Sequence, residues 1–373
     1  ITPDKAQKKL VWTSVDIDGG SKSVNLDQPF TALDYYRDVA VLAYPDVPFG
    51  RVNGKDDLRK VEADWTPEEA ENQSGIDALF DGDMSNYLWI NAAAKTQRVV
   101  TMELKEAKTA RAFTIYWHGW TMPTTLLVEY SKDGKTYQTA VDEKPKSDFE
   151  WVQVMMPANS RTFTFPAVKA KYWRMKTSCG FGSMALIEAE LTSEPRINNM
   201  EIKAGFTQAH NWGQTAKILA TVTLPTPMEK NPPPSAMVPS KKVLNLTRYM
   251  DDAGKLNYKF PRGKWTVLRL GYTATGEHII PATQEGRGLE CDKLDPDVIN
   301  FQLESLVGEL VKELGPIVGT GYNGVWLDSW EAHGQNWTGI LPKEFKKRRG
   351  YDLIPYLPLI ANGQLIDSVE VSE

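Results

Sequence analysis

The sequence predicts a multidomain protein that joins an all-β region to an α/β region. Three observations support this fold class. The chain has 373 residues with 41% hydrophobic content, enough for two or three domains of about 100–200 residues each. Short alternating strands fill its middle part. Toward its end, helical and strand patterns follow one another.

Changes in these patterns divide the chain into four predicted parts. They are an early segment at 1–63, an all-β domain at 64–193, a small additional β element with a connector at 194–275, and an α/β segment at 276–373.

Within the all-β domain, four stretches alternate as half-buried strands do. They are Ala112–Trp117, Leu126–Tyr130, Lys171–Lys176 and Ala185–Leu191. The second leads into a turn in which Asp133-Gly134 supplies the positive φ of a tight hairpin. Strands this short, with no helical pattern between them, predict an all-β sandwich.

The domain also resembles the discoidin-like jelly rolls that include many carbohydrate-binding modules. The resemblance rests on Ile76–Asp83 followed by Trp89, on the hairpin Val128–Gly134 and on the closing strand Glu188–Leu191. Sugar-binding faces of such modules carry exposed rings at loop tips, for which the candidates are Trp117, Trp120 and Trp151.

The same resemblance implies a structural calcium ion held by Asp83, Asn86 and Glu188. Oxygen ligands from one turn and one distant strand suit a hard cation. Asn86 departs from the threonine usual at that place, and a solvated turn is the alternative.

A proline run, Asn231-Pro232-Pro233-Pro234-Ser235, opens the connector. It is stiff and poor in backbone donors, so it predicts a loop. Beyond it, Val243–Thr247, Leu256–Phe260 and Trp265–Leu270 are typical of antiparallel strands, the last two joined through Pro261-Arg262-Gly263-Lys264. We expect a small β element attached to the α/β segment.

The last part of the chain alternates helix and strand. After Asp295-Pro296-Asp297, apolar residues recur at helical spacing from Phe301 to Leu314, and Gly315 stands at the expected C-cap. Gly324–Asp328 is a short apolar strand, and a second helix opens after Pro342, turns Phe345 inward and ends at Gly350. This order predicts part of a (β/α)8 barrel of the TIM type, whose active sites lie at the C-terminal ends of the strands.

The chemistry is therefore expected just after Leu327, where Glu331 stands among polar and aromatic residues. Partial desolvation there would raise the pKa of a glutamic acid, so that it can protonate the leaving oxygen of a glycoside. Glu331 is the predicted proton donor. The predicted substrate-binding residues around it are Asp328, Trp330, His333, Asn336 and Trp337. An N-cap or a surface charge is the alternative role of an acidic residue after a strand.

A second cluster, Glu285–Asp295, packs four acidic and two basic residues into a glycine-containing loop. Its Glu290 and Asp292 are predicted to bind sugar hydroxyls or a metal ion, and a salt-bridged loop is the alternative.

Several long motifs, taken in order, resemble the inverting α-L-rhamnosidases of glycoside hydrolase family 106. They are Lys9–Trp12, Asp34–Pro45, Gly288–Asp295, Leu327–Ala332, Gln335–Thr338 and Phe345–Asp352. The resemblance covers nearly the whole chain and implies that 1–63 is an early barrel segment, with the jelly roll inserted after it.

That resemblance further implies hydrolysis of terminal α-L-rhamnosides from plant or bacterial polysaccharides, with inversion, by a donor and a base glutamate and with calcium in the active site. The donor matches Glu331, whereas no strand followed by a base glutamate is found before Glu373. We expect the remainder of the same polypeptide to supply the base, and the chain alone to be an inactive fragment.

Composition narrows the possible partners and location. A net charge of -5 and a pI near 5.6 give no basic face for nucleic acid. No apolar run approaches the roughly 18–20 residues of a membrane span. The N-terminus lacks the charged, apolar and small-residue regions of a signal peptide, so we expect either that a leader has been removed or that the chain starts within a longer protein. The family implies a secreted, periplasmic or cell-surface bacterial enzyme.

The competing hypothesis is a non-catalytic carbohydrate-binding protein that acts through the jelly roll. Such a protein would keep its affinity for sugar after Glu331→Gln, whereas the enzyme would lose turnover.

Overall fold

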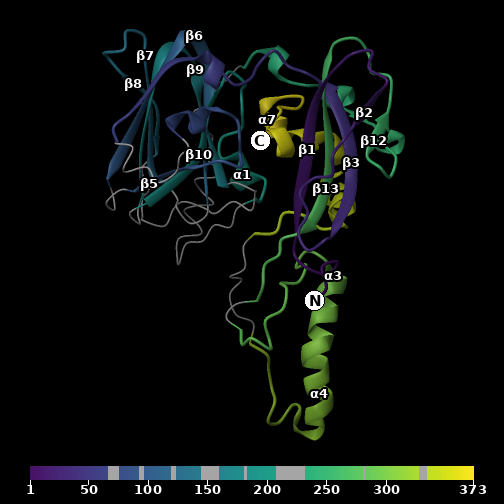
Figure 1. Cartoon of the computed structure of the whole chain (residues 1–373). Coiled ribbons are helices and arrows are strands. Elements are labelled where there is room, and N and C mark those ends of the chain that lie inside the picture. Colours follow the sequence, from purple (N-terminus) through teal and green to yellow (C-terminus); the bar gives the residue numbers. More distant parts are fainter. Residues whose placement is uncertain are drawn as a thin grey trace. The chain divides into compact units, whose positions relative to one another are not determined.

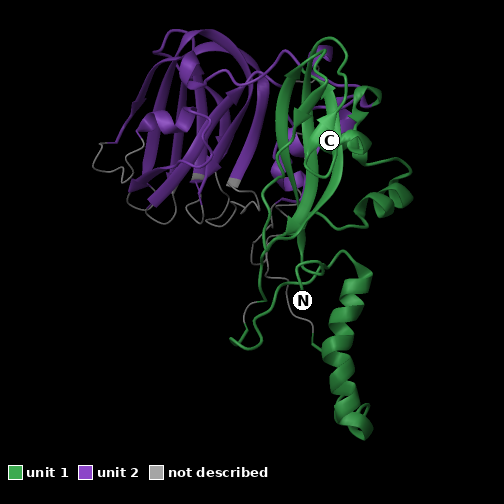
Figure 2. Cartoon of the chain, turned by 45° about the vertical axis from the view of Figure 1, so that its right-hand side comes forward, with its two compact units in different colours: residues 1–46, 241–357 green, residues 47–240, 358–373 purple. Residues whose placement is uncertain are grey.

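The computed structural model describes residues 1–65, 75–91, 96–118, 123–143, 159–179, 183–206, 232–279, 282–326 and 334–373. They form two compact units (Figure 2): unit 1 comprises residues 1–46 and 241–357, and unit 2 comprises residues 47–240 and 358–373. The polypeptide therefore leaves unit 1 after Asp46 and returns to it at Lys241.

Unit 1 is built on a four-stranded antiparallel sheet (Figure 1). Its strand order is β1 (Lys8–Asp18), β13 (Lys264–Ala274), β3 (Tyr36–Pro45) and β11 (Leu244–Asn245). β13 pairs along its whole length with β1, and its other edge pairs with β3. A two-stranded antiparallel ribbon joins β2 (Ser23–Asn25) to β12 (Lys255–Asn257). Strands more than 200 residues apart in sequence thus share one sheet.

The core of unit 1 draws side chains from both segments of the chain. Its buried members are Leu26, Val41, Ala43, Leu246, Leu256, Phe260, Trp265 and Val267. Beside this core, Arg269 on β13 makes a bidentate ion pair with Asp38 on β3, at 2.9 Å (Nε–Oδ1) and 3.0 Å (Nη2–Oδ2). Gly271 is required next to them, because a Cβ there would lie 2.4 Å from the Tyr36 ring. Burial and a fork-shaped charge pair therefore fix the register of β3 against β13.

The helices of unit 1 follow the sheet in sequence. α3 (Pro296–Leu303) continues through a π-helical turn (Glu304–Gly308) into α4 (Glu309–Leu314), and α5 (Leu341–Arg349) follows later. α6 (Leu357–Asn362) begins at the last residue of unit 1. The predicted ends are confirmed: Asp295 caps α3 by accepting from the Asp297 amide, and Gly350 ends α5 with a φ of +83°. Across the described ranges, no helix is both long enough and apolar enough to span a membrane.

Antiparallel strands form in both stretches predicted around Pro261–Lys264, and their partners come from the start of the chain: β12 pairs with β2, while both edges of β13 are taken by β1 and β3. The expected strand Gly324–Asp328 is irregular as far as Trp326, and its last two residues lie outside the described ranges. Trp326 is 86% exposed. A strand forms only where another strand can pair with it, and the local sequence does not reveal that partner.

The partial TIM-type barrel is likewise not what the described residues show. The named sheets are antiparallel, whereas a (β/α)8 barrel needs parallel strands. The apolar residues that recur at helical spacing from α3 to α4 are not covered: Phe301, Leu306 and Leu310 are exposed. Helical spacing predicts an apolar stripe, but it does not say whether that stripe is covered.

The described residues of unit 2 contain seven antiparallel strands. They are β4 (Leu58–Ala63), β5 (Leu88–Asn91), β6 (Gln97–Trp117), β7 (Pro123–Ser131), β8 (Gln138–Glu143), β9 (Asn159–Cys179) and β10 (Ser183–Thr192). Their order is β5-β10-β6-β9-β7-β8, and β4 pairs with the first half of β6. The four strand stretches predicted here from alternation are confirmed. Its described residues also include two short α-helices, α1 (Met200–Lys203) and α7 (Val369–Ser372), and all of α6 after Leu357.

The long strands β6 and β9 each pair with more than one neighbouring strand around the core of unit 2. The second half of β6 pairs with β10, and a register shift between Glu103 and Lys108 separates its two halves. Each long strand therefore belongs to two parts of the sheet (Figure 1). Large side chains fill the interior, among them Phe80, Phe113, Trp117, Phe165 and Trp173. Trp117 was a candidate sugar-binding ring, but it is fully buried; Trp120 and Trp151 lie outside the described residues.

We expect Asp38→Asn to destabilise unit 1 by about 2 kcal/mol. The substitution leaves Arg269, which is 6% exposed, without its carboxylate partner. The loss is smaller than the ~3–5 kcal/mol of a fully buried pair, because the Asp38 side chain is 34% exposed. Calorimetry would measure this. The matched control is Glu344→Gln in the exposed pair with Arg348, where less than about 0.5 kcal/mol is expected. Equal effects would contradict the importance of the β3–β13 pair.

The same variant should reveal a pH dependence. Burial acts to raise the Asp38 pKa, but hydrogen bonds from Arg269 and Tyr36 outweigh it, so the pKa is lowered in the folded state. Stabilisation by a lowered carboxyl pKa is present above the unfolded pKa, about 3.9, and is lost as the pH falls further. The stability difference between wild type and Asp38→Asn should therefore shrink below about pH 4.

Candidate active site

Half of the residues predicted for the active site are described, and all of those lie in unit 1. They are Glu290, Asp292, Asn336 and Trp337. Asp328, Trp330, Glu331 and His333 lie outside the described residues, so the expected shared face of Glu331 and Glu290 stays a prediction.

Backbone hydrogen bonds bring three distant segments together at the start of β1. The Gln7 amide donates to the Glu290 carbonyl at 2.8 Å, and the Asp292 amide donates to the Lys5 carbonyl at 2.8 Å. On the other side, an isolated antiparallel bridge joins Lys8 to Trp337. The beginning of β1 therefore lies between the acidic loop and the segment that follows the predicted catalytic motif.

The Asp292 carboxylate is the centre of this arrangement and is 1% exposed. Oδ2 lies 3.1 Å from Lys8 Nζ and accepts from the Thr338 hydroxyl at 2.8 Å. Oδ1 accepts from the Gln335 side-chain amide and from the Leu294 backbone amide. We call Lys8, Asp292, Gln335 and Thr338 the Asp292 cluster. A buried carboxylate with a charged partner and several donors holds those donors in place. Removing any one of them would leave part of the buried negative charge without a hydrogen-bond partner.

The next two residues, Asn336 and Trp337, are also held in place. Asn336 Oδ1 accepts from the Leu10 amide of β1 at 2.9 Å. Trp337 is buried, and its indole N–H has no hydrogen-bond partner among the described residues. Its ring lies 6.5 Å from that of Tyr272, which in turn lies 6.2 Å from Tyr35. A row of aromatic rings thus extends from the Asp292 cluster across β13.

Tyr35 is a neighbour of the site that motif reasoning did not select. Its ring lies 5.8 Å from Lys8 Nζ, and burial, aided by Tyr272, raises its pKa to about 12. The residues before it, Leu33 and Asp34, both have positive φ, and Thr273 Oγ1 donates to the Tyr35 carbonyl at 2.7 Å. Two non-glycine residues in the left-handed region cost energy. Tyr35 lies in a quoted motif, but Tyr272 and Thr273, which contact it, are more than 200 positions away.

Glu290 makes an ion pair with Lys293, and the Glu290 amide donates to the Glu277 carbonyl. The isolated bridge between His278 and Leu289 continues this contact. Within the described residues the acidic loop is therefore salt-bridged, which was the alternative that composition left open. A sugar-binding role for Glu290 or Asp292 stays a prediction.

The predicted structural calcium site lies in unit 2, and its donors have other partners. Glu188 makes a 2.6 Å ion pair with Arg51 and accepts from the Gly82 amide. Asp83 Oδ1 accepts from the amide and hydroxyl of Ser85, and the Asn86 amide donates to the Asp83 carbonyl. Throughout the described ranges, no three acidic, histidine or cysteine side chains are grouped to hold a metal ion. The described donors thus do not fit calcium, because the Arg51 guanidinium supplies the positive charge at Glu188.

Comparison with known proteins identifies the family. The model of the alpha-L-rhamnosidase family, glycoside hydrolase family 106, matches residues 1–373. The chain belongs to this family. It is similar in structure to a rhamnosidase from Novosphingobium sp. PP1Y, with a TM-score of 0.75 and 25% identity over 98% of this chain and 33% of that one.

Two further proteins are similar to parts of this chain. A protein of Formosa agariphila, named "Putative beta-glucuronidase", is 39% identical over 141 residues, which are 38% of this chain and 12% of that protein. Chitosan-binding module 1 of a chitosanase/glucanase from Paenibacillus sp. IK-5 is 15% identical over 38% of this chain and 97% of the module, with a TM-score of 0.30. The chain thus spans a third of the length of the rhamnosidase and about an eighth of the Formosa protein.

We expect Asp292→Ala to destabilise unit 1 by about 3–5 kcal/mol, because it leaves the Lys8 ammonium buried without a counterion. Denaturant unfolding would measure the loss. The matched control is Glu290→Ala, which removes a partly exposed pair with Lys293 and should cost about 1 kcal/mol or less. Similar losses in both variants would show that the Asp292 cluster does not hold the three segments together.

Calcium removal tests the assignment of Arg51. We expect a chelator to leave the stability of unit 2 unchanged. Hydrogen exchange of the β10 amides would measure that stability. Arg51→Met should lower that stability by about 3 kcal/mol at neutral pH, since Glu188 would be buried without a counterion. Arg59→Met, in an exposed pair with Glu103, is the control. A fall in stability on chelation of the wild type would restore the calcium prediction.

The pH dependence of Arg51→Met has a defined sign. Burial raises the Glu188 pKa, whereas Arg51 and the Gly82 amide act to lower it. Removing Arg51 raises the folded pKa further, and a raised carboxyl pKa destabilises the protein where the unfolded carboxyl is ionised. The loss should therefore be larger at pH 7 than at pH 4.

Proposed function

We propose that this chain acts as part of an inverting glycosidase that removes terminal α-L-rhamnose from plant or bacterial polysaccharides, with Glu331 as the proton donor. The observation that carries the proposal is the match of residues 1–373 to the alpha-L-rhamnosidase family, which includes the motif Leu327–Ala332. A bacterial enzyme with such a substrate acts outside the cytoplasm, so we also propose a secreted, periplasmic or cell-surface location.

The surroundings of the motif support a catalytic role. A proton donor must be held in a fixed place relative to the glycosidic oxygen. Gln335, Asn336 and Thr338 follow Glu331 within seven positions, and all three make side-chain hydrogen bonds to the Asp292 cluster or to β1. In our proposal, Asp292 is a positioning residue and Glu331 the residue that touches substrate.

The catalytic base is proposed to come from the remainder of the same polypeptide. In an inverting enzyme the second carboxylate lies about 6.5–9.5 Å from the first and activates a water molecule. Asp292 is enclosed by its donors, and Glu290 is paired with Lys293. Neither arrangement suits a general base, so we propose that the chain alone is inactive. Calcium in the active site, which the family resemblance implies, stays a prediction.

Turnover by the full-length protein tests the proposal. It should release rhamnose with inverted configuration, as followed by NMR of the fresh product, from a rhamnose-containing polysaccharide. Glu331→Gln should reduce that turnover about 10²–10⁴-fold, and should matter much less on an activated aryl α-L-rhamnoside, which needs little protonation. The matched control is Glu313→Gln on the exposed side of α4, which should leave turnover unchanged.

Other outcomes would contradict specific parts of the proposal. Equal loss on both substrates would mean that Glu331 positions the sugar and is not the acid. Robust hydrolysis by the 373-residue chain would place the base within it. Sugar binding without turnover in the full-length protein would favour the carbohydrate-binding hypothesis.

A further inference from the structure

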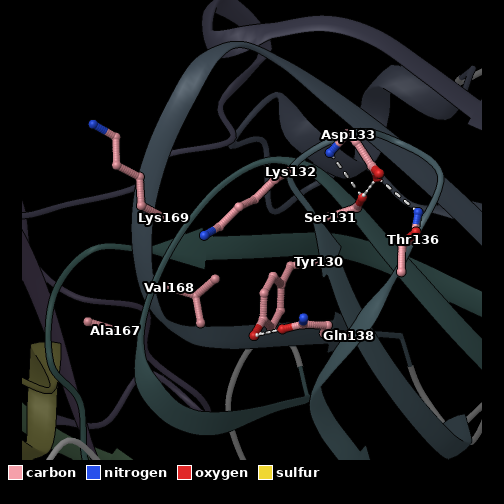
Figure 3. Close-up of a pocket in the computed structure, with 9 residues that line it drawn as sticks. All are labelled: Tyr130, Ser131, Lys132, Asp133, Thr136, Gln138, Ala167, Val168 and Lys169. Carbon is pink, nitrogen blue, oxygen red and sulfur yellow. Dashed lines mark hydrogen bonds between the residues drawn. The ribbon is translucent and has the colours of Figure 1, made fainter.

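A cavity of about 440 Å³ opens in unit 2 at the hairpin between β7 and β8 (Figure 3). Its walls come from the end of β7, the start of β8 and residues 167–169 of β9. All of these residues belong to one compact unit. No motif of the active site lies there, so the cavity has no role in the reaction proposed above.

The hairpin that forms one wall is rigid. The Asp133 carboxylate accepts from the Ser131 hydroxyl at 2.8 Å and from the Lys135 and Thr136 amides at 2.9 Å each. These hydrogen bonds lower the Asp133 pKa to about 2, and the one from the Thr136 amide has the largest effect. Gly134 takes a φ of +73°, and a Cβ there would lie 3.2 Å from the Tyr172 ring. The wall is therefore formed before any ligand arrives, which reduces the entropic cost of binding.

The cavity combines an apolar surface with two lysine side chains, and the ionised Asp133 carboxylate, held by its own hairpin, also lines it. The Tyr130 ring packs on Trp173 at 5.8 Å, and its hydroxyl donates to Gln138 Oε1 at 2.6 Å. Val168 lies beside that ring and the Lys132 ammonium points toward the two, while the Lys169 side chain, which also lines the cavity, points away from them (Figure 3). Both lysines are exposed, and no ion pair joins either one to another described residue.

We propose that this cavity is a binding site for an anionic sugar residue, a pyranose that carries a carboxylate or a sulfate group. The C–H face of the pyranose would lie on the Tyr130 ring and Val168, which suits an amphipathic ligand. The anionic group would lie beside the Lys132 ammonium, with Lys169 adding positive charge at the rim of the cavity. Gln138, already oriented by the Tyr130 hydroxyl, is within the same wall and offers its amide to a sugar hydroxyl.

The site would hold a charged polysaccharide while the active site cleaves another residue of the same substrate. This use rests on the proposed function, but binding itself does not depend on turnover.

Calorimetric titration of the full-length protein with a short oligogalacturonate, a sulfated oligosaccharide and a neutral oligosaccharide of similar length tests the site. Binding of either anionic ligand, weakened by added salt and stronger than that of the neutral one, is expected. The double variant Lys132→Ala, Lys169→Ala should weaken it roughly tenfold. The matched control, Lys55→Ala with Lys105→Ala, removes the same charge from exposed positions of unit 2 and should bind as the wild type does.

The outcomes separate this site from the proposed function. Binding of one anionic ligand alone identifies its anionic group, and binding of both indicates recognition of negative charge; each supports the site. No binding of either ligand, or binding unchanged in the Lys132, Lys169 double variant, would overturn it. Turnover of a neutral aryl rhamnoside should stay the same in that variant, so failure of the site leaves the enzymatic proposal standing.

Discussion

The pairing of β13 with both β1 and β3 is the constraint on which the rest of unit 1 depends. One strand from late in the chain lies between two strands from its start, and its backbone groups are satisfied on both edges. The start of β1 then lies beside the acidic loop and the segment after the catalytic motif. Without β13 in that place, Lys8 could not reach Asp292 across 284 positions of sequence.

Two buried carboxylates show how similar residues serve different purposes. Asp292 is paired with a lysine and ties together the segments around the candidate active site. Glu188 is paired with Arg51 in unit 2, at the place where the resemblance implied calcium. A guanidinium satisfies a buried carboxylate with directed hydrogen bonds and needs no ion from solution.

Much of the candidate site could be inferred from short motifs, because the chemistry of each residue is local. Glu290, Asp292, Asn336 and Trp337 were selected from their motifs as substrate-binding residues, and that role stays a prediction. Their partners could not be recognised in the same way. Lys8, Tyr35 and Tyr272 join the site only through tertiary contacts, and nothing in their local sequence distinguishes them from ordinary strand residues.

The sequence by itself determined the family, the alternating strands of unit 2 and the helix ends at Asp295 and Gly350, since these depend on side-chain pattern and on caps within a few residues. Only the tertiary structure decided which strands pair, because any edge of suitable pattern offers the same backbone donors and acceptors. It likewise decided that Trp117 is core and that Lys132 and Lys169 flank a cavity. Burial is a property of the whole chain's packing, and a residue's type does not fix it.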